Sequence, residues 1–347
     1  SDHGGTINIA SGNGLHGDGG LVRIAAGASD EVKGGLIEVM SGSGTFDGGD
    51  LKLIAGSGLN KGGVMEVRSG SSNDGLSGDA VLQTGDGVQS GEVIVGSGSA
   101  SSDGSGSLTL STGSAGSSAG SIKVSAGRST TGSGSGIELS AGGSDDSNAM
   151  GGSITATASS GSEGGMIEMQ SGQGTAGSAG GVRIVAGDST FDGAGGGVSV
   201  VGGSSSDVGG SIDMTAGAGS ITSGRVMISS GESRSGPGGA ISIHGSMSEK
   251  DEGGSIDVVS GQGGTGGGDL KLSSGEGHSS NGIVSVTSGS SSTSGMSGVI
   301  SVASQDAERS SGTVSLGTGA ATMGASGSVV LSSGASSSSA GSIIINS

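Results

Sequence analysis

Pairs of aliphatic residues separated by one position recur every 13 to 17 residues along the whole chain. The first pairs are Ile7 with Ile9 and Val22 with Ile24, and 24 such pairs can be counted. Residues two positions apart lie on the same face of a β-strand, because side chains alternate with a period of two. The spacing therefore predicts 24 short strands, each with one aliphatic face.

Glycine and other small residues frame each pair at fixed positions. Gly stands two positions before the first aliphatic in 23 of the 24 repeats, and Ser135 is the exception. Two positions after the second aliphatic the residue is always Ser, Thr, Ala or Gly, and the next residue is Gly in 20 of 23 repeats. Another small residue, such as Gly44 or Ser189, follows two positions later. We expect corners there, where backbone torsion angles or close approach exclude a side chain.

Short strands and corners at constant spacing predict an all-β fold, a parallel β-solenoid of 24 repeats of about 14–15 residues. Disorder is the alternative that a chain rich in Gly and Ser suggests, but disorder would not keep the pairs in register. One continuous array is expected over residues 1–347, as a fragment of a longer repeat chain, since both ends fall inside a repeat. The predicted structural core comprises the pairs, represented by Ile7, Ile9, Val22, Ile24, Ile37, Val39, Leu51, Leu53, Ile122, Val124, Ile212, Met214, Leu270 and Leu272.

Charges between the aliphatic residues bear on how many repeats form one coil. Arg23, Glu38, Lys52 and Glu66 alternate in sign along successive repeats. Strands stacked about 4.8 Å apart favour opposite charges, which favours one repeat per coil. With two repeats per coil, aliphatic pairs from opposite sheets would face each other and seal the core better. Both arrangements stay open.

Composition excludes several classes of protein. The chain has 85 Gly, one Pro, two aromatic residues (Phe46 and Phe191) and no Cys, which rules out disulfides and thiolate metal sites. A formal net charge of −18 with scattered Lys and Arg argues against nucleic acid as a partner. No apolar run approaches the ~20 residues that cross a bilayer, so no membrane insertion is expected.

Candidate chemistry is sparse, and we expect the protein not to be an enzyme. The four histidines, His3, His16, His244 and His278, lie in different repeats and share no register, so neither a metal site nor a catalytic site is predicted. No cofactor is expected. Acidic residues in the variable stretches offer carboxylates for weak Ca²⁺ binding, although their main expected role is to keep the chain soluble. These residues are Asp47, Asp145, Asp146, Asp192, Asp207, Asp251 and Glu252.

Some positions on the face opposite the aliphatic pairs are also apolar. Apolar residues on both faces of a strand imply that the second face is covered, either by the chain's own turns or by another copy. The candidate lateral interface consists of Leu21, Leu36, Met40, Ile54 and Val64. Binding to ice through a Thr face is a competing hypothesis, but Thr155 and Thr157 are isolated. An ice or glycan surface is not excluded as a partner.

The repeats, which follow a "GGxIxVxSGSG"-like pattern over the full chain, resemble Ser/Gly-rich tandem-repeat proteins of aquatic microbes and algae. That resemblance implies a surface or extracellular scaffold, stalk or filament, and it carries over no functional residue. The expected function is therefore a structural repeat protein that forms a stiff extracellular or cell-surface rod or filament by lateral or end-to-end association with copies of itself. The alternative is a binding module, either ice-binding or an adhesin shaft, that presents a flat solenoid face.

Overall fold

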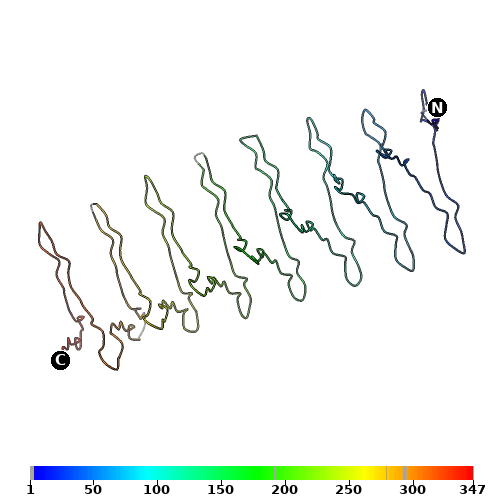
Figure 1. Ribbon diagram of the computed structural model, residues 1–347. Coiled ribbons are helices and arrows are strands. Elements are labelled where there is room, and N and C mark those ends of the chain that lie inside the picture. The colour runs from blue at the N-terminus through cyan, green and yellow to red at the C-terminus, as the bar shows by residue number, and fades with distance from the viewer. Residues whose placement is uncertain (1–3, 191–192, 279, 292–294, 347) are drawn as a thin grey trace. The chain divides into compact units, whose positions relative to one another are not determined.

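The computed structural model describes residues 4–190, 193–278, 280–291 and 295–346. None of these residues belongs to a helix or a β-strand: extended segments alternate with loops (Figure 1). The predicted all-β solenoid, with one or two repeats per coil, is therefore wrong. What the sequence pattern does produce is a regular alternation of loop and segment.

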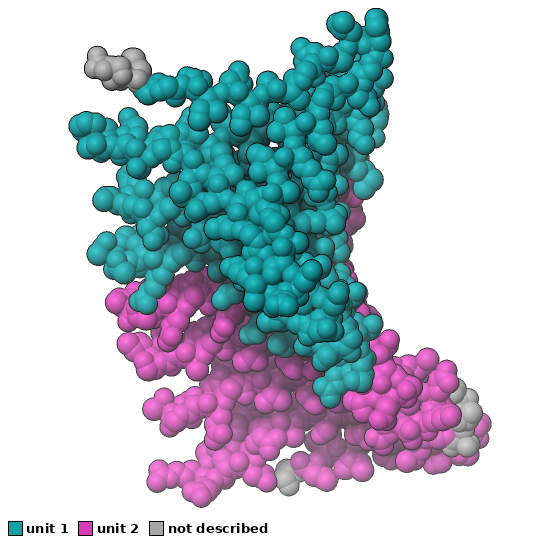
Figure 2. All heavy atoms as spheres, turned by 90° about the vertical axis from the view of Figure 1, so that its right-hand side faces the viewer, with its two compact units in different colours: residues 1–169 teal, residues 170–347 magenta. Residues whose placement is uncertain are grey.

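Two compact units divide the chain, Ser1–Met169 and Gln170–Ser347. Within each unit the same course of segment and loop recurs (Figure 1). The surface of each unit has projections separated by open gaps (Figure 2). Among the described residues no side chain is buried, so neither unit contains a hydrophobic core.

A single backbone hydrogen bond closes the base of most loops. The N–H of Gly20 donates to the carbonyl of Gly12 at 2.9 Å, and the N–H of Gly63 donates to the carbonyl of Gly56 at 2.8 Å. Sixteen bonds of this kind join the described residues, and the one remaining backbone bond lies inside a loop, from Ala149 to Asp146. The donor is the Gly two positions before an aliphatic pair, and the acceptor follows the preceding pair. We call this closed base the loop neck.

The pattern of loop necks explains why the solenoid prediction fails. A solenoid requires the N–H and C=O groups along each segment to bond to a neighbouring segment about 4.8 Å away. Between the necks, the described segments make no such backbone bonds. Ordering glycine is costly in backbone entropy, and aliphatic side chains that stay exposed do not offset that cost. Period-two alternation is therefore present within each segment, without the ladder that would make it a strand.

Close approach at the neck, and not an unusual torsion angle, accounts for the Gly before many of the pairs. No described residue has a positive φ angle. A Cβ added to Gly20 would lie 3.0 Å from the Cβ of Ser11, and one added to Gly35 would lie 3.0 Å from the Cβ of Ala26. The small residue that ends one segment thus faces the glycine that begins the next. The same contact therefore explains why a small residue recurs at the end of one segment and why Gly recurs at the start of the next.

In many of the loops the small residue builds one of two turns. Where it is Gly, as at Gly44 and Gly58, an added Cβ would overlap the carbonyl oxygen of the residue three positions later. Where it is Ser, the hydroxyl oxygen instead accepts a hydrogen bond from the backbone N–H three positions later, as Ser72 does from Gly75 at 2.9 Å. The same bond forms at Ser29, Ser129, Ser233 and Ser248, at distances of 2.9 to 3.2 Å.

Substitution of Gly58 tests the loop geometry. Gly58→Ala places a methyl group on the Lys61 carbonyl oxygen, so we expect the loop to open and the bond from Gly63 to Gly56 to break. A typical backbone hydrogen bond is worth about 0.5–1.5 kcal/mol, which corresponds to roughly fivefold faster amide exchange at Gly63. Gly56→Ala is the matched control, because an added Cβ there meets nothing within 4 Å. Equal exchange rates in the two variants would contradict the assigned geometry.

Candidate functional site

The exposed fraction of an aliphatic side chain depends on its position within the repeat. Beyond the first repeat, the first members of the predicted core pairs are 49% exposed (Ile37) to 55% exposed (Leu51). The second members are more exposed, from 65% at Leu53 to 76% at Leu272. Leu59, which lies in a loop, is fully exposed. The aliphatic residues of the segments therefore form a partly shielded strip, which we call the aliphatic strip, and none of its described side chains is buried.

The opposite face of the same segments is mixed, and some of its charged residues pair along the segment. Lys52 forms an ion pair with Asp50 at 3.2 Å, and Lys271 forms the equivalent pair with Asp269 at 3.0 Å. Arg68 pairs with Glu66 in the same way. Each pair joins residues two positions apart, as period-two alternation requires. The predicted pairing of opposite charges between successive repeats is not what joins these side chains.

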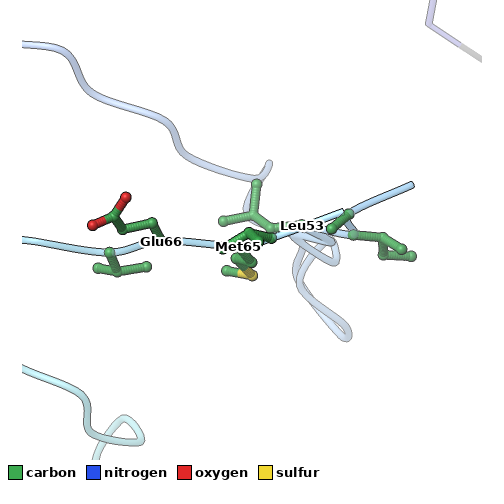
Figure 3. A pocket seen from close by; sticks show the side chains of 7 residues that line it. Leu53, Met65 and Glu66 are labelled. Atoms are coloured by element: carbon green, nitrogen blue, oxygen red, sulfur yellow. The ribbon is translucent and has the colours of Figure 1, made fainter. Parts of the chain in front are cut away.

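Three consecutive segments in the first compact unit form an apolar hollow. Leu53, Ile54, Ala55, Val64, Met65, Glu66 and Val67 line one part, of about 330 Å³. An adjoining part of about 360 Å³ shares Met65 and Val67 and adds Ala80, Val81 and Leu82. Figure 3 shows Met65 and the Glu66 carboxylate on opposite sides of their segment. We refer to residues 53–55, 64–67 and 80–82 together as the apolar hollow.

The structure brings together only part of the predicted site residues. Ile54 and Val64 from the candidate lateral interface line the hollow, with Leu53 from the predicted core. Leu21, Leu36 and Met40 are exposed and lie outside it. The remaining predicted core residues are likewise exposed and outside the hollow: Ile7, Ile9, Val22, Ile24, Ile37, Val39, Leu51, Ile122, Val124, Ile212, Met214, Leu270 and Leu272.

A signal in the sequence could have located the hollow. The residue after one aliphatic pair and the residue before the next flank the same loop neck. Ile54 and Val64 are in these positions around the neck of Gly56 and Gly63. At no other neck position of the sequence are both flanking residues Leu, Ile, Val or Met. Two apolar segments are therefore held together there on both faces, which leaves an apolar concavity.

The one charged residue that lines the hollow is paired, so the hollow offers mainly apolar contact to a partner. Glu66 is the one charged residue lining the hollow, and it is paired with Arg68. Where the chain is described, no three His, Asp or Glu side chains gather to hold a metal ion. His244 contacts Ser242 two positions away in its own segment. Weak calcium binding stays a prediction, and His3, Phe191 and Asp192 lie outside the described residues.

No protein-family model, curated protein or solved structure is significantly similar to the chain. None of the described residues belongs to a helix that is long and apolar enough to cross a membrane.

Proposed function

We propose that this is a structural repeat protein that associates with copies of itself, laterally or end to end, into extracellular or cell-surface filaments. The observation that carries the proposal is the exposure of the aliphatic strip: among the described residues, every large aliphatic side chain is at least 49% exposed. Monomeric soluble proteins rarely leave apolar surface contiguous on this scale, and such surface marks a site of interaction. The extracellular or cell-surface location follows from the resemblance of the repeats alone.

The backbone supports association with another extended chain. Between the loop necks, the described segments have N–H and C=O groups without backbone partners. Unpaired groups of this kind are a template for pairing with a further extended segment, which adds main-chain hydrogen bonds to apolar contact. A second copy offers many such segments in the same chemical form. Association between copies of the chain therefore covers aliphatic side chains and also supplies partners for the backbone N–H and C=O groups.

Charge partition favours contacts through the segments. The segments, taken as the residues between the framing glycines, contain 10 acidic and 7 basic residues, whereas the loops contain 21 acidic and 6 basic residues. The loops thus carry a net charge of −15 and the segments only −3. Loops of two copies repel each other, so the nearly neutral segments are the parts that approach most easily.

Electron microscopy of the purified chain at neutral pH, with and without calcium, tests the proposal. We expect filaments of regular width, with sedimentation showing a mass that rises with protein concentration. Single chains under every salt, calcium and protein concentration would overturn self-assembly by this chain. Assays of ice and glycan binding would then test the alternative function.

A further inference from the structure

We infer that the apolar hollow over residues 53–55, 64–67 and 80–82 is the site where a second copy of the chain first docks, through one of its extended aliphatic segments. This inference rests on the proposed function and names the contact from which assembly starts. Apolar side chains from three consecutive segments line this hollow, and Glu66 is the one charged residue among them. A concave apolar surface removes more area from water per contact than a flat strip does.

The lining of the hollow selects an uncharged, extended partner. Leu53 at 65% exposure, Met65 at 57% and Val67 at 76% leave most of their surface for an incoming side chain. Glu66 is already neutralised by Arg68, so the lining offers no free charge to hold a charged partner. The segments that form the hollow also lack backbone partners between their necks, which an extended partner supplies.

The loops at the ends of these segments restrict which part of a partner enters. Asp47, Asp74 and Asp86 lie in three of the neighbouring loops and Lys61 lies in the fourth, so these loops are acidic overall, as are the loops of an approaching copy. A loop of a second copy is therefore repelled, whereas its segments carry little net charge. An aliphatic segment of a second copy matches the hollow in apolar character and low charge, and it is therefore the occupant.

The absence of Cys from the chain makes the test direct. Val67→Cys, coupled to a benzophenone maleimide, places a photo-cross-linker inside both parts of the hollow. Val286→Cys is the matched control, because Val286 is also the second member of a pair, is 69% exposed and lies outside the hollow. Each labelled protein is mixed with an equal amount of isotope-labelled chain and illuminated at the lowest concentration that gives oligomers.

Mass spectrometry of the cross-linked peptides then decides the inference. We expect isotopically mixed products from Val67→Cys, mapped to aliphatic segments, at roughly five times the yield from Val286→Cys, which corresponds to a modest site preference. Equal yields from the two positions, products mapped to loops, or products without isotope mixing would each overturn the inference. If oligomers form in these cases, the proposed function stands; if no oligomers form at any concentration, that function fails as well.

Discussion

Replacing Leu51, Leu53, Met65 and Val67 with Ser is expected to raise the protein concentration needed for self-association on the order of 100-fold. Full burial of such a side chain is worth roughly 1.5–3 kcal/mol. Leu51 is 55% exposed and Val67 is 76% exposed, so each still has about half or more of its surface to transfer from water. Four such losses amount to at least about 3 kcal/mol, which is a factor of about 100 or more in an equilibrium constant.

The control for this experiment replaces the same number of large aliphatic residues in the loops. Leu15, Leu59, Leu76 and Val88 lie in loops and are between 92% and 108% exposed. Their replacement with Ser lowers overall hydrophobicity by a similar amount and leaves the aliphatic strip intact. Light scattering against protein concentration, at fixed salt, measures both variants. Equal effects of the two sets would show that association depends on apolar content in general, and would contradict a contact made by the segments.

The sequence "GGDLKL" occurs twice, at residues 48–53 and 267–272, and comparing the two copies shows how far the sequence predicts the structure. The repeat pattern predicts identical local structure there, and both copies have a loop neck followed by an ion pair between Asp and Lys two positions apart. Local alternation is encoded by neighbouring residues, because it depends only on the period of two. The glycines before the pairs were likewise predictable as sites of close approach, and most of them face a small side chain across a neck.

The absence of a hydrogen-bond ladder between the described segments could not be predicted in the same way. A period of two says which side chains share a face, but not whether the backbone has a partner 4.8 Å away. In this chain the backbone bonds of the described residues are confined to the loops. When each repeat is considered alone, nothing distinguishes Ile54 and Val64, which line the hollow, from Leu21 and Leu36, which do not. Their difference comes from the neck between them, which joins two apolar residues from successive repeats.

The second large effect concerns salt, and it follows from the −15 net charge of the loops. We expect the concentration needed for self-association to fall at least about tenfold between 0.01 M and 1 M NaCl, because the screening length shortens from about 30 Å to about 3 Å. Apolar contacts are not weakened by this change, whereas repulsion between acidic loops is largely removed. Sedimentation at a series of salt concentrations measures the threshold.

A loop variant separates repulsion between loops from a general effect of salt on apolar association. Eight acidic loop residues are replaced with Ser, a residue already common in these loops: Asp18, Asp30, Asp47, Asp74, Asp86, Asp103, Asp188 and Asp207. The loops of this variant keep a net charge of −7 in place of −15, so we expect its threshold at 0.01 M NaCl to lie between the parent's thresholds at 0.01 M and 1 M, with a smaller response to added salt. If the variant and the parent shared one threshold at low salt, the acidic loops would not be what holds the copies apart. Association of the parent chain would then have to be limited by the segments themselves, through the cost of ordering their glycine-rich backbone.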